Sequence, residues 1–181
     1  MVYRQARVED IPSLLKLHFK YQIDSIAEED KKDGFVTTAF TKEELELLIK
    51  EENGLFVALK SEEVVAYVMA ASWEFWSKWA MFAFMIEDLK NCSYKEEKLT
   101  TKNSYQYGPI CIEKSLRGSG VLEKIFAFAL KKMSYRFKYL ITFVNKNNPR
   151  SFEAHKRKLG LEVLKEFEFN NNHYYEMICK T

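Results

Sequence analysis

The chain has 181 residues and a formal net charge of +2, with 47% hydrophobic and 30% charged residues. This composition is typical of a folded globular protein, and the length suits one domain that buries roughly 70% of its unfolded surface. The charge is too small to attract nucleic acid or an anionic membrane, so any anion site has to be local.

The first part of the chain predicts a strand, two helices and a hairpin. A short strand is expected around Val2–Arg7, and Asp10 is a suitable cap for the helix that follows. The segment Thr41–Glu44 reads TKEE, a capping box that predicts the start of a second helix. Leu55–Lys60 and Val64–Ala71 predict a hairpin. The first helix would present one face made of Ile11, Leu14, Leu15, His18 and Tyr21.

The middle of the chain is aromatic. Ser72 can cap one helix in which Trp73, Trp76, Ala80, Ala83 and Phe84 recur at helical intervals, and core packing is one interpretation of this stripe. A polar loop is expected at Asn91–Asn103, and a strand at Tyr105–Ile112, interrupted by Gly108–Pro109 as an edge, a bulge or a distortion.

The last part predicts a helix, a strand, a second helix and a hairpin. An apolar stripe predicts a helix from the residues after Gly120 to about Tyr135, and Tyr139–Val144 is a buried type of strand. Pro149 suits the first turn of a helix that ends at Gly160. Asparagines 170–172 tolerate a positive φ and predict a closing hairpin turn. No repeat or linker is present, so we expect one domain, 1–181.

The three cysteines, Cys92, Cys111 and Cys179, are odd in number and lack C-x-x-C spacing. They predict neither a disulfide framework nor a zinc site, so we expect no metal. The N-terminus lacks the apolar region of a signal peptide, and Trp79–Ile86 is too short to cross a membrane. We therefore expect a cytoplasmic protein with no membrane or nucleic-acid partner.

The segment Arg117–Gly120 connects a predicted strand to a predicted helix. Glycines let a phosphate approach the backbone, and a helix start attracts anions, so this loop is a candidate phosphate cradle. A plain connecting turn is the alternative. The P-loop spacing is absent, and Glu123 stands where the dinucleotide fingerprint has its third glycine.

Two motifs resemble those of the GNAT superfamily of acyl-CoA-dependent N-acyltransferases. In ICIEKSLRGSGVL, Arg117 and Gly120 match the first and fourth positions of the glycine-loop motif, whereas Leu122 replaces a small residue. In NPRSFEAHKRKLGL, the matching residues include His155 and Gly160, which are one step further apart than is usual. A reshaped helix end is therefore expected there. The other matches are Asn148, Ser151 and Leu159.

The resemblance implies a mixed α/β fold with a central, mostly antiparallel, twisted sheet, splayed between the two motif strands and flanked by helices. It also implies acetyl-CoA as co-substrate and transfer of an acetyl or short acyl group to a primary amine of a small molecule or peptide. Residues of the first motif would hold the pantetheine arm and the pyrophosphate: Ile110, Cys111, Ile112, Arg117, Gly118, Ser119, Gly120, Val121 and Leu122. Asn148 and Ser151 would contact the arm.

Acyl transfer from a thioester to an amine needs a neutral amine, a polarised thioester carbonyl and a proton for the departing thiolate. His155 stands where many relatives place a proton-donating tyrosine, although it could equally be packed beside Phe152 and Leu159. Glu113 and Tyr107 are candidate bases on one strand face, and for Glu113 a solvated carboxylate is the alternative. Cys111 has no identifiable base beside it and is interpreted as a small apolar residue.

Two other functions fit the sequence. A CoA-binding module without turnover would explain Leu122 and the absence of a tyrosine at position 155. A homodimeric interaction protein would explain the aromatic segment around Trp73 and Trp76. The resemblance also implies a second interpretation of Trp73–Ile86, in which this segment shapes the acceptor pocket or a dimer face. The acceptor itself is not indicated by the sequence.

Overall fold

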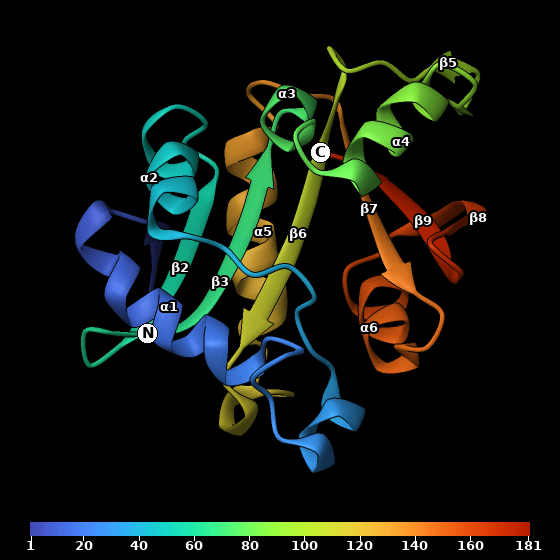
Figure 1. Cartoon of the computed structure of the whole chain (residues 1–181). Helices are drawn as coiled ribbons and strands as arrows, with labels where there is room; N and C mark the ends of the chain where they lie inside the picture. Colours follow the sequence, from blue (N-terminus) through green and yellow to red (C-terminus); the bar gives the residue numbers. More distant parts are fainter. The chain divides into compact units, whose positions relative to one another are not determined.

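The computed structural model describes the backbone of residues 1–181 and the side chains of residues 1–31 and 34–181 (Figure 1). The strands are β1 (Val2–Gln5), β2 (Leu55–Lys60), β3 (Glu63–Ala71), β4 (Ser93–Tyr94), β5 (Glu97–Lys98), β6 (Ser104–Ile112), β7 (Tyr139–Asn145), β8 (Glu162–Phe169) and β9 (Asn172–Lys180). The α-helices are α1 (Ile11–Tyr21), α2 (Lys42–Lys50), α3 (Trp73–Trp76), α4 (Ala80–Leu89), α5 (Val121–Met133) and α6 (Pro149–Glu153). Shorter helical turns are η1 (Val8–Asp10), η2 (Glu28–Asp33), η3 (Lys114–Leu116) and the π-helical η4 (Ala154–Lys158).

The larger sheet has seven strands in the order β1-β2-β3-β6-β7-β9-β8. The registers of β1 with β2, β2 with β3, β7 with β9 and β8 with β9 are antiparallel. The two motif strands, β6 and β7, are parallel, and their register comprises three residue pairs, Ser104–Gln106 with Tyr139–Ile141. The predicted mixed fold with a mostly antiparallel sheet flanked by helices is confirmed, and the short β6–β7 register agrees with the predicted splay.

The chain forms two compact units, the first made of residues 1–69 and 108–129. In this unit α1 and α5 pack on opposite faces of the sheet (Figure 1). His18 of α1 contacts Tyr67 of β3, and Phe128 of α5 contacts Phe56 of β2. Tyr67 is paired with the neighbour of Phe56, so the two rings point to opposite faces. The core includes Leu14, Leu45, Leu48, Leu55 and Phe56.

The second unit consists of residues 70–107 and 130–181. Phe82 of α4 contacts Phe143 of β7, while Phe152 of α6 contacts Tyr175 of β9. Phe143 and Tyr175 are on adjacent register positions and therefore on opposite faces, so α4 and α6 cover opposite sides of these strands. The core here includes Trp73, Trp76, Tyr105, Leu140, Ile141 and Met177.

Local sequence signals were accurate where the chemistry is local. The Thr41 hydroxyl accepts a bond from the Glu44 amide, and the Glu44 carboxylate accepts one from the Thr41 amide, as the capping box predicts. The closing turn places Asn170 and Asn171 at positive φ, as expected. Asp10 precedes α1, but its carboxylate accepts bonds from Arg4 and the Arg7 amide and does not cap that helix.

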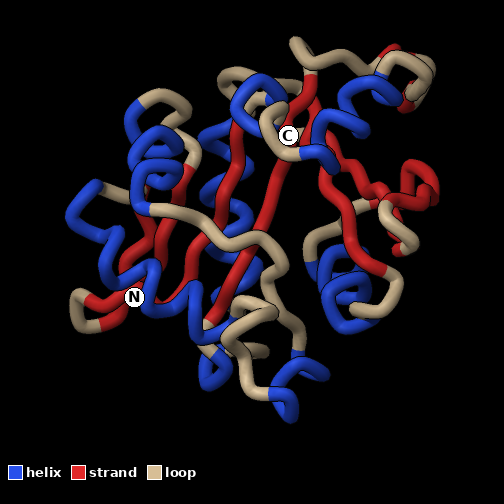
Figure 2. The backbone as a smooth tube through the Cα atoms, viewed as in Figure 1, coloured by secondary structure: helices blue, strands red, loops and turns tan.

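Two predictions for the middle of the chain were wrong. The aromatic segment forms two helices, α3 and α4, because Trp79 adopts an extended backbone between them (Figure 2). The indole N–H groups of Trp73 and Trp76 donate to the Ser104 hydroxyl and the Gln106 carbonyl, and the break lets Phe82 pack on Trp76. The expected loop at 91–103 contains the two-stranded β4–β5 sheet. Burial of Trp73 and Trp76 confirms core packing for these two residues.

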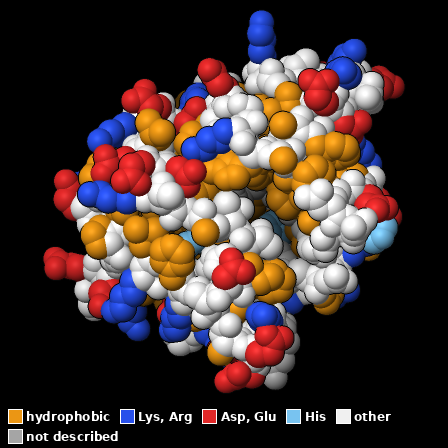
Figure 3. Space-filling model, in the orientation of Figure 1, with side chains coloured by type: hydrophobic (Ala, Val, Ile, Leu, Met, Phe, Trp, Pro, Cys, Tyr) orange, Lys and Arg blue, Asp and Glu red, His pale blue; other side chains and the backbone are white. Residues whose placement is uncertain are grey.

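Charged side chains of both signs are interspersed on the face drawn in Figure 3. This distribution agrees with the net charge of +2 and with an anion site that has to be local. Among the residues described, none of the helices combines the length and the apolar character needed to cross a membrane.

Candidate functional site

The glycine loop joins the end of β6, through η3, to the N-terminus of α5. Gly118 and Gly120 both have a φ of +84°, a conformation that favours glycine. A Cβ atom at either position would meet nothing within 4 Å, so the backbone here borders open space. The loop leads into a helix of 13 residues, whose free N–H groups carry partial positive charge. This geometry fits an anion that approaches the backbone closely.

Arg117 is anchored at the entrance of this loop. Its Nε donates to the Ile112 carbonyl at 3.1 Å, and its guanidinium lies 4.8 Å from the ring centroid of Tyr21. These contacts hold the side chain against β6 and α1 and give Arg117 a structural role at the loop.

Glu113, a candidate base, is engaged by three donors. Its carboxylate accepts bonds from the Lys20 ammonium at 2.8 Å, the Tyr21 hydroxyl at 2.8 Å and its own neighbour's amide, Lys114 N, at 3.0 Å. Partial burial acts to raise the pKa of Glu113, but the bonds from Lys20 and Tyr21 outweigh it and leave that pKa below its ordinary value. The carboxylate is thus ionised but weakly basic.

Cys111 belongs to a buried polar chain on the α1 face of β6. Its thiol is hydrogen-bonded to the Tyr67 hydroxyl, which lies 2.7 Å from Nδ1 of His18. Burial raises the pKa of Cys111 to about 12 and lowers that of His18 to about 4. Both groups are therefore neutral near pH 7, which argues against Cys111 as a nucleophile.

The second motif lies in the second unit and positions His155. The Asn148 side chain accepts a bond from the Ser151 amide at 3.1 Å, so Asn148 caps α6, and Pro149 occupies its first turn. His155 is buried, with its ring edge-on to Tyr107 at a centroid distance of 5.8 Å. Thr142 donates to the Tyr107 carbonyl at 2.7 Å, which fixes that strand residue.

The tautomer of His155 follows from its partner. Nδ1 lies 2.8 Å from the Ser151 carbonyl oxygen, and since a carbonyl only accepts, Nδ1 carries the proton. Burial lowers the pKa of His155, and the bond to Ser151 only partly opposes this. The ring is therefore neutral, with a lone pair on Nε2. In this state Nε2 accepts a proton before it can donate one.

The helix that carries His155 ends in a π turn. After α6, residues Ala154–Lys158 form a π-helical segment, in which the Leu159 amide donates to the Ala154 carbonyl, five residues back. A π turn accommodates one extra residue in a helix. This explains the additional step between His155 and Gly160, and the prediction of a reshaped helix end is confirmed.

The comparisons with known proteins concern the fold. No protein-family model matches the chain, and a search of curated proteins finds no match. Among solved structures, a ribosomal-protein-alanine N-acetyltransferase from Brucella melitensis is similar with a TM-score of 0.65 and 16% identity, covering 100% of both chains. An acetyltransferase of the GNAT family from Streptococcus pneumoniae matches at 0.65 and 12%, covering 99% of this chain and 98% of that one.

A third structure is a GNAT superfamily phosphinothricin acetyltransferase from Sinorhizobium meliloti in complex with acetyl-CoA. It matches at a TM-score of 0.64 and 15% identity and covers 99% of this chain and 87% of that chain. The chain has the GNAT fold.

Within this GNAT fold, the predicted site residues fall into two groups. The first unit brings together Ile110–Glu113 and Arg117–Leu122, and the second unit brings together Tyr107, Asn148, Ser151 and His155. Leu122 is half-buried in the first turn of α5, where the glycine-loop motif has a small residue.

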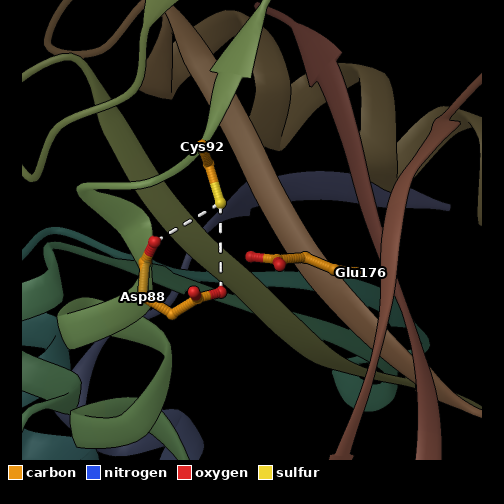
Figure 4. A group of neighbouring side chains, drawn as sticks. All are labelled: Asp88, Cys92 and Glu176. Carbon is orange, nitrogen blue, oxygen red and sulfur yellow. Dashed lines mark hydrogen bonds between the residues drawn. The ribbon is translucent and has the colours of Figure 1, made fainter.

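A separate cluster in the second unit has the ligand types of a metal site. Asp88, Cys92 and Glu176 offer ligand atoms that all lie within 4.8 Å of one another (Figure 4). The Cys92 thiol contacts the carbonyl and the carboxylate of Asp88. However, the Lys165 ammonium forms ion pairs with both Asp88 and Glu176, so a cationic side chain already occupies the position beside these carboxylates. We therefore assign this cluster a structural role.

Sequence reasoning missed Tyr21, Lys20 and Tyr67. Tyr21 contacts the amide of Lys114, which is 93 positions away. Helical periodicity placed Tyr21 on the buried face of α1 but carried no signal of what that face contacts. Pairings of this kind are decided by the tertiary structure.

Proposed function

We propose that the protein transfers an acetyl or short acyl group from acetyl-CoA to a primary amine of a small molecule or peptide. The observation that carries this proposal is the glycine loop, where Gly118 and Gly120 leave open space against the backbone at the start of α5. The GNAT fold supports it, and the solved neighbours include an acetyltransferase in complex with acetyl-CoA.

In the proposed complex, the amides of Gly118 and Gly120 and the first turn of α5 hold the pyrophosphate, while the Ser119 amide donates to the Leu116 carbonyl within the loop. Ile110, Cys111 and Ile112 offer backbone groups to the pantetheine amides, and Asn148 and Ser151 are further candidates for the arm. Arg117 shapes the loop through Ile112 and Tyr21, and its positive charge also favours the anion. Leu122 narrows the space at the helix start.

The reaction forms a nitrogen–carbon bond and breaks a carbon–sulfur bond, and the amine proton has to reach the leaving thiolate. We propose that Nε2 of His155 takes up the amine proton and returns it to the sulfur, since its Nδ1 already donates to Ser151. Glu113 is a weaker candidate because Lys20 is bound to it. Tyr107, in contact with the His155 ring, is a candidate for orienting that histidine or the amine.

Binding of CoA tests the proposal directly. Gly120→Val should weaken binding at least tenfold in calorimetry, because it adds a branched side chain where the phosphate would lie and strains a positive φ. Gly160→Val is the matched control, since Gly160 also has a positive φ, +72°, and open space around it. Acetyl transfer by the wild type to a panel of amines, read as free thiol, tests turnover. If saturating acetyl-CoA neither binds nor shifts the melting temperature, the proposal is wrong.

A catalytically weak CoA-binding protein is the second candidate function. The ion-paired Glu113 and the neutral His155 favour it, because neither group is poised to donate a proton near pH 7. It predicts CoA binding with no turnover on any amine. A thiol-release signal that requires both acetyl-CoA and an amine would exclude it.

A further inference from the structure

Tyr21, at the C-terminus of α1, contacts three residues of the glycine-loop motif. Its hydroxyl donates to the Glu113 carboxylate at 2.8 Å and accepts from the Lys114 amide at 2.9 Å. Its ring stacks against the Arg117 guanidinium, 4.8 Å away. Tyr21 is 3% exposed, whereas the Glu113 side chain is 23% exposed, so these contacts are partly shielded from water.

The tyrosine is itself held in place from the other side. Its carbonyl accepts the Val36 amide at 2.9 Å, and Gln22 forms a parallel bridge with Val36. Lys20 adds a second bond from α1 to Glu113, and Lys114 forms an ion pair with Asp30 at 2.6 Å. The end of α1 and the entrance of the loop are thus connected by several independent contacts.

The loop needs such an external support. Gly118 and Gly120 are permissive in φ and ψ, and no side chain at these positions restricts them. Inside the loop, the Ser119 amide and hydroxyl both donate to the Leu116 carbonyl of η3. The conformation of the loop therefore depends on η3 with Arg117 on one side and on the N-terminus of α5 on the other. An anion site made of backbone amides binds well only when those amides are aimed before the ligand arrives.

We propose that Tyr21 is a positioning residue that aims the glycine loop at the cofactor's pyrophosphate. This inference rests on the proposed function. The hydroxyl fixes the backbone at Glu113 and Lys114, and the ring fixes Arg117, whose Nε in turn holds the Ile112 carbonyl. Tyr21 acts on the pyrophosphate through the loop and has no role in the chemical step.

Tyr21→Phe tests this, because it removes the hydroxyl and keeps the ring. Losing two hydrogen bonds should raise the Kd for CoA and the KM for acetyl-CoA about tenfold and leave kcat within about twofold. The acetyl thioester of pantetheine, which lacks the pyrophosphate, should react equally well with both proteins. Tyr135→Phe, at a tyrosine that is 78% exposed, is the matched control and should change nothing.

Three results would overturn the inference. One is an unchanged Kd for CoA in Tyr21→Phe. Another is an equal loss with acetyl-CoA and with the pantetheine thioester, which would indicate a general structural defect. Hydrogen exchange of the amides of residues 114–120 without CoA should be faster in Tyr21→Phe, and an unchanged rate also refutes the positioning role. This readout does not depend on CoA. It therefore separates the two failures: an unchanged exchange rate refutes the inference, whereas wild-type protein that binds no CoA refutes the proposed function.

Discussion

Removing Lys165, whose ammonium pairs with Asp88 and Glu176, should destabilise the protein in a pH-dependent way. The Glu176 side chain is 3% exposed, and Lys165, at 28%, is its ion-pair partner at 3.4 Å. Breaking a buried pair by removing one partner costs about 3–5 kcal/mol, because the remaining charge stays buried. Lys165 is partly solvated, so we expect the lower end, about 3 kcal/mol, for Lys165→Met at pH 8.

The pH dependence follows from Glu176. Burial raises the pKa of Glu176, and Lys165 works against that rise. A carboxyl whose pKa is higher in the folded state contributes stability below its unfolded pKa, and this contribution is lost as the pH rises through its folded pKa. Without Lys165 the pKa of Glu176 should rise further, because the charge that opposes the effect of burial is gone. The deficit should therefore shrink as the pH falls from 8 to 5.

Urea unfolding of both proteins across this pH range measures the effect. Lys165→Met combined with Glu176→Gln should recover most of the stability at pH 8, since the buried charge of Glu176 is gone and the Asp88 carboxylate, which also loses its partner, is 33% exposed. Lys90→Met is the control: Lys90 pairs with Glu87 at 3.0 Å with both side chains exposed, and its loss should cost less than about 1 kcal/mol. A loss for Lys165→Met that is equally large at every pH would refute this reasoning, as would one no larger than that of Lys90→Met.

Two further predictions concern the proposed site. His155→Gln should lower kcat about 100-fold or more if Nε2 carries the proton. Wild-type kcat/KM, expressed per concentration of neutral amine, should stay high below pH 6.5, because burial holds the pKa of His155 below its ordinary value and the neutral ring persists there. A pH–rate profile of both proteins checks this, and equal kcat values contradict it. Leu122→Ala should tighten CoA binding severalfold in calorimetry by restoring a small residue at the helix start, whereas Leu130→Ala, at a half-buried leucine of the same helix, should leave the Kd unchanged; weaker binding in Leu122→Ala would show that this leucine supports the site.

The sequence by itself determined the features that depend on neighbours along the chain. The capping box at Thr41, the asparagine turn at 170–171 and the β2–β3 hairpin need only a few adjacent residues, and each formed as expected. The glycine loop is of the same kind, because its positive φ angles are a property of Gly118 and Gly120 themselves. The spacing from His155 to Gly160 likewise predicted the reshaped helix end.

Only the tertiary structure decided the features that depend on distant partners. The spacing of the aromatic stripe predicts a single helix, yet the chain forms two, α3 and α4. They separate because the indole N–H groups of Trp73 and Trp76 donate hydrogen bonds to β6. The protonation state of Glu113 depends on Lys20 and Tyr21, and that of His155 depends on burial. The hydrophobic periodicity of the sequence predicts neither of these environments. Tyr21 reaches the loop across 93 positions. A side chain's contacts follow from its place in space, and local pattern fixes only the direction in which it points.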